Sequence, residues 1–154
     1  MTHIRDEGLA LIAQFEGFSP VIYRCAAGLQ TIGYGHVVRP HEDFSGGISQ
    51  PQAWALLQAD AQQAAAAVDR LISVPLTTNQ REALMSFTFN LGAGALQRSS
   101  LRRCINRGEH EAVPAELMRW VWAGGRKLAG LMARRHAEGE WYGRGIFPLP
   151  LGEG

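Results

Sequence analysis

Apolar residues recur at helical spacing along most of the chain. Residues 4–15 predict a short amphipathic helix, which Gly17 ends. A long alanine-rich helix is predicted over residues 49–72, because a capping-box signature opens it and Pro75 stops it. Further helices are predicted over about 79–91, from about 99 to 108, and over roughly 109–122 and 130–142.

Between the first two helices the pattern changes to short extended stretches. Val21–Tyr23 and Thr31–Tyr34 predict two strands, because the turn signal Ala27-Gly28 separates them. No two of these stretches are long enough for a large sheet. The expected fold class is therefore α+β and mostly helical, with a small antiparallel β-hairpin lobe, a helical lobe and a long helix that joins them.

Composition limits the classes of protein that remain. Apolar residues make up 46% of the 154 residues, which is enough for one compact core. The longest apolar run is far below the roughly 18 residues of a membrane span, and the start lacks the pattern of a signal peptide. We therefore expect a protein that begins in the cytoplasm and has no transmembrane segment.

Charge is unevenly distributed although the net charge is only +1. Residues 1–75 carry 4 basic and 7 acidic side chains, whereas residues 95–144 carry 10 basic and 5 acidic ones. This asymmetry indicates either an anionic partner for the C-terminal half or a solvated arginine-rich face. Aromatic residues do not alternate with the arginines, so nucleic acid is not expected as a partner.

The cysteines and histidines do not predict a metal centre. Cys25 and Cys104 are far apart in sequence, and we expect both to be free thiols. The chain has neither Cys-x-x-Cys nor His-Glu-x-x-His, and its five histidines lack ligand spacing. No metal or other cofactor is therefore expected.

The candidate chemistry lies at the end of the first helix and in the hairpin that follows. Glu16 occupies the helix C-terminus, where the helix dipole disfavours a carboxylate, and Cys25 and Thr31 lie on the two arms of the hairpin. Glycosidic oxygen leaves only when an acid protonates it, and a second group must hold the attacking water. These residue types alone also fit a surface glutamate, a core cysteine and a strand threonine.

The spacing of these residues closely resembles the active-site segment of the phage-type lysozymes, the endolysins of glycoside hydrolase family 24. Glu16 is followed after eight residues by Cys25, and after five more by Thr31-Ile-Gly-Tyr-Gly-His36. The resemblance covers nearly the whole chain in family order. It continues through Leu76-Thr-Thr-Asn-Gln-Arg-Glu-Ala-Leu84, Ser86-Phe-Thr-Phe-Asn-Leu-Gly-Ala-Gly-Ala-Leu96, Arg119-Trp-Val-Trp-Ala-Gly-Gly125 and Gly130-Leu-Met-Ala-Arg-Arg-His-Ala-Glu138.

The resemblance implies a two-lobed lysozyme-like fold with a cleft between the lobes. The expected boundaries are about 1–48 for the N-terminal lobe, 49–73 for the connecting helix and 74–147 for the helical lobe. It further implies hydrolysis of the β-1,4 bond between N-acetylmuramic acid and N-acetylglucosamine in bacterial peptidoglycan, with lysis of the host cell.

By match to the family, Glu16 is the general acid and Thr31 orients the water. Cys25 stands where many members have Asp. A thiol of ordinary pKa, about 8.5, is only a few per cent ionised at pH 7, so we expect Cys25 to position water rather than to act as a nucleophile.

Further residues match less specific positions of the family. Saccharide contacts are expected at Val37, Phe89, Asn90 and Ser100. His36 is expected to support the hairpin. The tryptophans Trp120, Trp122 and Trp141 are expected in the core of the helical lobe.

Three alternatives stay open beside the hydrolase, and the weakest of them is a membrane-active protein that uses its basic C-terminal helices. A lytic transglycosylase needs only one acid and no water, and a non-catalytic peptidoglycan-binding protein needs neither. For the endolysin, the implied course is storage in the host cytoplasm, release by a holin and action in the periplasm on the cell wall. We expect a monomer, without stable insertion in the membrane.

Overall fold

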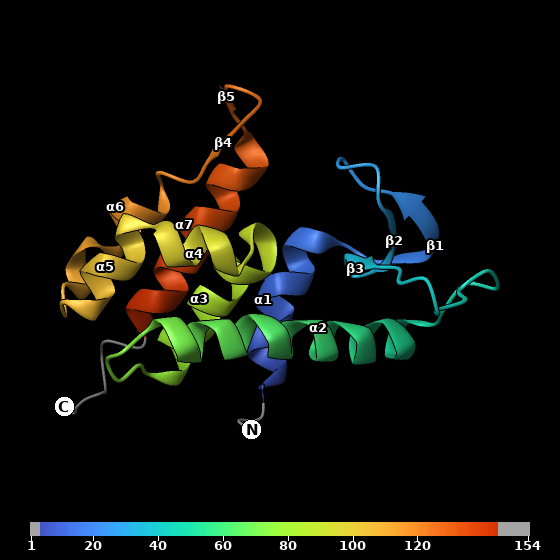
Figure 1. The fold of residues 1–154 in the computed structure, drawn as a ribbon, viewed down its shortest axis with the longest axis horizontal. Helices are drawn as coiled ribbons and strands as arrows, with labels where there is room; N and C mark the ends of the chain where they lie inside the picture. The colour runs from blue at the N-terminus through green and yellow to red at the C-terminus, as the bar shows by residue number, and fades with distance from the viewer. Residues whose placement is uncertain (1–3, 145–154) are drawn as a thin grey trace. The chain divides into compact units, whose positions relative to one another are not determined.

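The computed structural model describes residues 4–144 of the chain (Figure 1). Within this range the chain divides into two compact units, and the boundary between Gln62 and Gln63 falls inside one long helix. The part up to Gln62 is called the first unit below, and the part from Gln63 onward the second unit. The mostly helical α+β class that the sequence predicts is confirmed.

The first unit begins with helix α1, Asp6–Glu16. Its apolar positions Leu9, Leu11 and Ile12 are buried, as the helical spacing predicts. The helix ends where Gly17 takes φ 71° and donates its backbone N–H to the carbonyl of Ala13. A residue with a side chain is strained at such a φ, so Gly17 fixes the end of α1 directly after Glu16.

Three short strands follow α1 in an antiparallel sheet of order β1-β2-β3. They are β1, Ser19–Arg24, β2, Gln30–Gly33, and β3, His36–Val37. Tyr23 pairs with Thr31 across the first hairpin. The hairpin predicted around residues 27–28 is therefore confirmed, and its first strand is longer than the sequence indicated.

Helix α2, Gln50–Leu71, carries the chain from the first unit into the second. Its capping box forms as predicted, because Ser49 Oγ accepts from the N–H of Gln52 at 3.3 Å and Gln52 Oε1 accepts from the N–H of Ser49 at 2.8 Å. Within the described residues, no helix is long and apolar enough to cross a membrane.

The second unit is helical around an apolar core. Its main helices are α3, Thr78–Leu91, and α7, Ala129–Arg144, which pack against each other. Shorter helices complete the unit, and α6 also packs on α7 (Figure 1). They are α4, Ala93–Arg98, α5, Ser100–Asn106, the 3-10 turn η1, His110–Ala112, and α6, Val113–Leu117. The core contains Val68, Leu84, Phe87, Leu96, Leu101, Ile105, Val113, Leu117 and Tyr142, among others.

Helix starts and ends in the second unit differ from prediction in two places. The capping box of α3 is formed by Thr77 and Gln80, so the helix begins one residue before the predicted start at about 79. Helix α4 was not predicted, because Gly92 and Gly94 indicated only the end of the preceding helix. Gly92, at φ 93°, ends α3, and the next helix begins at once.

The predicted helix over 109–122 is only partly confirmed, because η1 and α6 cover residues 110–117 and the chain then leaves the helical conformation. After α6 the chain forms a two-residue strand pair, β4, Trp122–Ala123, and β5, Arg126–Lys127. Gly124 and Gly125 both have positive φ, which suits the tight turn between such strands. As a consequence Trp122 is 56% exposed, so its predicted place in the core is also wrong. The other two tryptophans, Trp120 and Trp141, are partly buried against the core.

Candidate active site

The first unit brings Glu16, Cys25 and Thr31 into one neighbourhood. Glu16 ends α1, Cys25 follows β1, and Thr31 lies on β2. Tyr23 lies close to both acidic groups. Burial first, and then the charges of Glu16 and Cys25, raise the pKa of its phenol. The residues that the sequence selected over a span of fifteen positions are thus neighbours in space.

Gly35 lets the Glu16 side chain approach the backbone of the turn between β2 and β3. A Cβ atom at this position would lie 2.6 Å from Glu16 Oε1, which is too close for any side chain. The backbone of Gly35 also has φ +79°, a region that favours glycine. This role of Gly35 was not predicted, although the two glycines of the Gly-Tyr-Gly-His run indicate a backbone of unusual geometry.

The Cys25 sulfur lies at a tight turn rich in hydrogen-bond donors. The turn is closed by the bond from the N–H of Gly28 to the carbonyl of Cys25, at 2.8 Å. Hydrogen bonds from the backbone of Leu29 and Ala27, and then from the Thr31 hydroxyl, stabilise the thiolate and lower the pKa of Cys25 below its ordinary value. The expectation of an ordinary thiol pKa is therefore wrong, and a larger fraction of Cys25 is ionised at neutral pH than was expected.

Thr31 is 2% exposed and has a second partner for its hydroxyl. Its Oγ1 donates to the carbonyl of Leu29 at 2.9 Å. A hydroxyl has a single proton, so Thr31 donates either to this carbonyl or to the Cys25 sulfur, and its lone pairs stay able to accept from water. Val37, a predicted saccharide contact, pairs with Thr31 across the sheet and is 45% exposed.

His36 supports the sheet, as the sequence suggested. Its ring is 4% exposed, with Nδ1 2.7 Å from Asp60 Oδ2 and Nε2 2.9 Å from Glu42 Oε1. Burial by itself would lower the pKa of His36, but the hydrogen bonds to Glu42 and Asp60 outweigh burial and raise it above its ordinary value. His36 therefore ties β3 to the following loop and to α2, and its two carboxylate partners were not predicted.

The remaining predicted contacts, Phe89, Asn90 and Ser100, belong to the second unit and are half-buried. Asn90 lies near the end of α3, and its Oδ1 accepts from Arg135 Nη2 at 2.6 Å. Ser100 begins α5, and its hydroxyl donates to Glu116. The structure thus gives each polar residue of this set a fixed partner.

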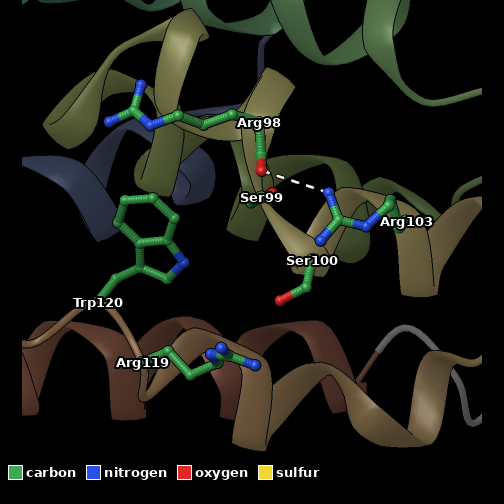
Figure 2. A pocket seen from close by; sticks show the side chains of 6 residues that line it. All are labelled: Arg98, Ser99, Ser100, Arg103, Arg119 and Trp120. Atoms are coloured by element: carbon green, nitrogen blue, oxygen red, sulfur yellow. Dashed lines mark hydrogen bonds between the residues drawn. The ribbon is translucent and has the colours of Figure 1, made fainter.

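Ser100 lines a basic pocket of about 300 Å³ (Figure 2). Arg98, Arg103, Arg119 and Trp120 lie around it with Ser99. The guanidinium of Arg98 lies 5.8 Å from the centre of the Trp120 ring. Three of the ten basic residues between positions 95 and 144 therefore gather around one pocket, each with its guanidinium group.

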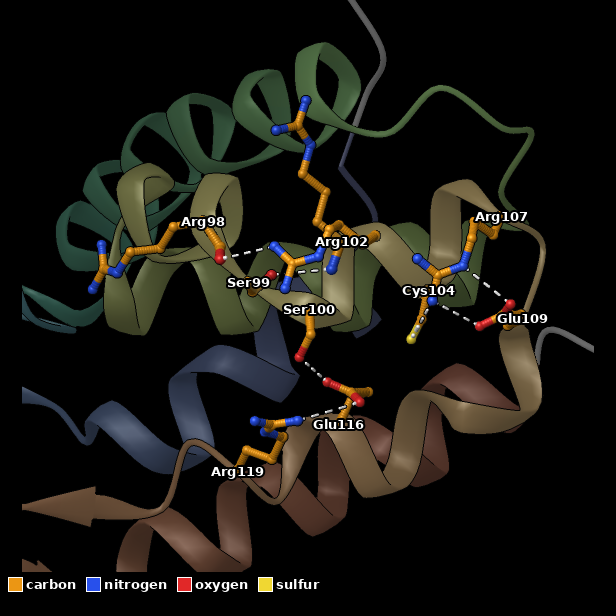
Figure 3. A network of polar contacts seen from close by, with 10 residues as sticks. Arg98, Ser99, Ser100, Arg102, Cys104, Arg107, Glu109, Glu116 and Arg119 are labelled. Carbon is orange, nitrogen blue, oxygen red and sulfur yellow. Dashed lines mark hydrogen bonds and ion pairs between the residues drawn. The ribbon is translucent and has the colours of Figure 1, made fainter.

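Ion pairs neutralise only part of this basic region (Figure 3). Arg107 pairs with Glu109 at 3.0 Å, and Arg119 lies 3.8 Å from Glu116. Among the described residues, Arg98 and Arg103 have no carboxylate partner. Arg103 Nη1 instead donates to the backbone carbonyl of Arg98 at 3.4 Å. The pocket consequently keeps an excess of positive charge.

Both cysteines are free thiols in the structure. Cys25 belongs to the first unit and Cys104 to the second. Burial is the first cause that raises the pKa of Cys104, so this thiol is less reactive than Cys25. Among residues 4–144, no three His, Cys, Asp or Glu side chains gather in a way that could hold a metal ion.

Comparison with known proteins decides the family. The family model described as phage lysozyme matches residues 13–138, a stretch that contains the whole Glu16, Cys25 and Thr31 neighbourhood. The chain belongs to the phage lysozyme family. Phage lysozymes are glycoside hydrolases, so the predicted enzyme class, a muramidase, is confirmed.

Individual relatives of this phage lysozyme agree with the family model. The endolysin of Acyrthosiphon pisum secondary endosymbiont phage 1 is 40% identical over 140 residues, which cover 88% of this chain and 94% of that protein. The SAR-endolysin of Escherichia phage Mu is 37% identical over 127 residues, 82% of this chain and 73% of that protein. Among solved structures, the muramidase domain of SpmX from Asticaccaulis excentricus has a TM-score of 0.83 and 32% identity, covering 92% of this chain and 98% of that one.

These findings confirm the predicted fold class and the predicted function of a peptidoglycan-hydrolysing endolysin. They do not test the roles of individual residues. Glu16, Cys25 and Thr31 as catalytic groups, and Val37, Phe89, Asn90 and Ser100 as saccharide contacts, therefore stay predictions.

Proposed function

We propose that Glu16 is the general acid of this endolysin and that Cys25 and Thr31 hold the attacking water. The observation that supports this most strongly is the contact of the Glu16 carboxyl group with the turn at Gly35. The Glu16 carboxyl group lies against the turn that follows β2, the strand that carries Thr31. Protonation of a leaving group and attack by water require such proximity.

The proposed hydrolysis consists of proton donation, cleavage of the glycosidic bond and attack by water. The protonated Glu16 gives its proton to the oxygen of the β-1,4 bond, and the bond from that oxygen to the muramic acid C1 breaks with its electron pair on the oxygen. A water oxygen forms the new bond to C1 and loses a proton to the Cys25 thiolate, and exchange with solvent then restores the protonated Glu16 and the thiolate. The products are two glycan ends, one of them a reducing N-acetylmuramic acid.

Cys25 takes the place of a carboxylate in this scheme. Its lowered pKa gives it more thiolate than an ordinary cysteine, and the thiolate can attract a proton of the water. Thr31, which is buried and held by Leu29, can accept from the same water. The pair therefore orients and polarises water without a covalent intermediate.

The glycan contacts and the lobes are part of the same proposal. Val37 in the first unit, and Phe89, Asn90 and Ser100 in the second, are proposed to contact the saccharide. We keep the predicted lobe limits, about 1–48, 49–73 and 74–147, as a proposal. The position of α2, Gln50–Leu71, is in accord with the middle segment.

We further propose that the enzyme is held in the host cytoplasm until a holin opens a path, and then acts as a monomer on the wall from the periplasm without stable membrane insertion. The support is its similarity to phage endolysins. Expression in cells with and without an inducible holin tests the route. Lysis without the holin would contradict it.

Glu16→Gln tests the proposed acid. The variant should lower the rate of clearing of outer-membrane-permeabilised cells by at least about 10²- to 10⁴-fold, because the amide cannot donate a proton to the leaving oxygen. Glu7→Gln is the matched control, since Glu7 is an exposed glutamate in the first turn of the same helix. Near-parental activity of Glu16→Gln with an unchanged circular dichroism spectrum would show that the assigned acid is wrong.

Mass spectrometry of the digested wall separates this proposal from the alternative enzyme. Hydrolysis leaves reducing muramic acid ends, whereas a lytic transglycosylase leaves anhydro ends. A parental protein that binds wall and releases no fragments would instead point to the non-catalytic alternative.

A further inference from the structure

The second unit contains a buried group of charged residues between α3 and α7. Arg135 and Glu138 are 0% exposed, and Arg135 Nε lies 2.9 Å from Glu138 Oε1. Glu138 Oε2 also accepts from Ser86 Oγ at 2.6 Å. Buried charges are held in place by such partners, because each would otherwise be strongly disfavoured in the core.

Three contacts fix the guanidinium of Arg135. It pairs with Glu138, and it lies over the ring of Phe87 with 5.2 Å between Cζ and the ring centre. The third contact is the 2.6 Å hydrogen bond from Nη2 to Asn90 Oδ1. Asn90 is half-buried, so part of the residue remains accessible although its Oδ1 contacts this buried group.

The chemistry of arginine decides which way Asn90 is turned. A guanidinium has only donors, so it can bond the oxygen of the carboxamide and not its nitrogen. The NH₂ group of Asn90 then points away from Arg135. Among the described residues this NH₂ group has no hydrogen-bond partner, so it is free to donate to a ligand.

We infer that Arg135 is a positioning residue, which turns Asn90 so that its NH₂ group binds a hydrogen-bond acceptor of the substrate. This inference rests on the proposed function, in which Asn90 contacts the wall. In peptidoglycan the strongest acceptors that cannot also donate are carbonyl-type oxygens, those of the N-acetyl groups and of the attached peptides. The position is thereby selective for such an oxygen and against an N–H donor.

Asn90→Asp tests the direction of the hydrogen bond. The new carboxylate still accepts from Arg135, so the melting temperature should equal or exceed that of the parent. It offers no N–H to the substrate, so KM for soluble wall fragments should rise about tenfold with kcat within about twofold. Parental KM would overturn the inference, because a merely structural Asn90 loses nothing in this substitution.

Two controls separate the donor from other effects. KM is measured at low and high salt, since repulsion between the new charge and an anionic wall is screened, whereas loss of a donor persists. A KM that returns to the parental value at high salt would overturn the inference. Asn90→Leu, which removes both contacts, should raise KM and also lower the melting temperature, because Arg135 loses an acceptor.

Arg135→Lys tests the positioning itself. A lysine ammonium cannot replace the planar fork that reaches both Glu138 and Asn90, so the Asn90 side chain should become mobile. The readout is ¹⁵N relaxation of the Asn90 NH₂ group, with KM measured beside it. An Asn90 group as rigid as in the parent, with parental KM, would overturn the role of Arg135. If this variant fails to fold, Asn90→Asp still decides the direction of the bond.

The outcomes also separate this inference from the proposed function. An active Glu16→Gln variant would refute the assigned acid and leave the KM of Asn90→Asp interpretable. A parental KM in Asn90→Asp, with Glu16→Gln inactive, would refute the inference and leave the acid in place.

Discussion

The most direct test of the site geometry is Gly35→Ala, which adds one carbon atom beside Glu16, the proposed acid. The added Cβ would lie 2.6 Å from Glu16 Oε1 and 3.2 Å from the carboxyl carbon. Ordinary contact begins at 3.4 Å, so the carboxyl oxygen has to withdraw by about 0.8 Å, or the turn has to move instead. Either movement separates Glu16 from the position it holds against the hairpin.

The magnitudes follow from this displacement. A shift of about 1 Å in a reacting group can cost on the order of 10²-fold in rate, so we expect wall hydrolysis to fall by that order. The backbone of Gly35 has φ +79°, where a side chain costs about 1–2 kcal/mol. For a chain of this size, that loss lowers the melting temperature by about 2–8 °C.

Gly108→Ala is the matched control. Gly108 has the same φ of +79°, and a Cβ there would meet nothing within 4 Å. It should lose similar stability and keep its activity. The assay is the clearing of permeabilised cells at a temperature where both variants are folded by circular dichroism. Equal activity of the two variants would refute the argument that Gly35 fixes the acid.

Three more predictions concern pH, the thiol and charge. Asp60→Asn should destabilise by roughly 1–3 kcal/mol below about pH 6, measured by thermal unfolding, because it removes a partner of protonated His36. Since the pKa of His36 is raised, this loss should shrink as pH rises through that pKa, and a loss independent of pH would contradict it. Cys25→Asp should keep substantial activity and Cys25→Ala little. Because the pKa of Cys25 is lowered, the activity of the parent should rise with pH at values below the range in which an ordinary thiol ionises. Equal pH profiles for the parent and Cys25→Asp would argue against a role of the thiolate. Substituting Arg98 and Arg103 by Gln removes two positive charges, so less protein should pellet with anionic wall fragments. The amount that pellets should also depend less on salt, which screens such attraction with a Debye length of about 8 Å at 0.15 M. Pelleting of the parent that ignores salt would reject this electrostatic account.

The elements that could be predicted are those whose pattern extends over several turns. Helices α1 and α2 have a clear apolar face or a capping box, and both were found close to their predicted limits. The β4 and β5 strands have two residues each, which is shorter than any period a pattern can show. Helix α4 is short and begins directly after Gly92, the glycine that ends α3. The sequence pattern therefore did not indicate its start.

The residues of the candidate site also fall into those that a local pattern predicts and those that it does not. Glu16, Cys25 and Thr31 were selected because their spacing in one segment is specific. Gly35 and Arg135 were not, because their roles depend on which atoms approach them in the folded chain. Arg135 lies 45 residues from Asn90 in the sequence, and no local pattern indicates that the two side chains form a hydrogen bond.

This contrast between local and distant residues has a consequence for the order in which the enzyme is made. Glu16 and Thr31 are fifteen positions apart, and closing so short a segment costs little chain entropy. The contact between Asn90 and Arg135 forms only when α7, the last described helix, has left the ribosome and packed on α3. The acid and its hairpin can therefore assemble on a nascent chain well before substrate recognition is complete, so we expect full activity to appear only after α7 has been synthesised.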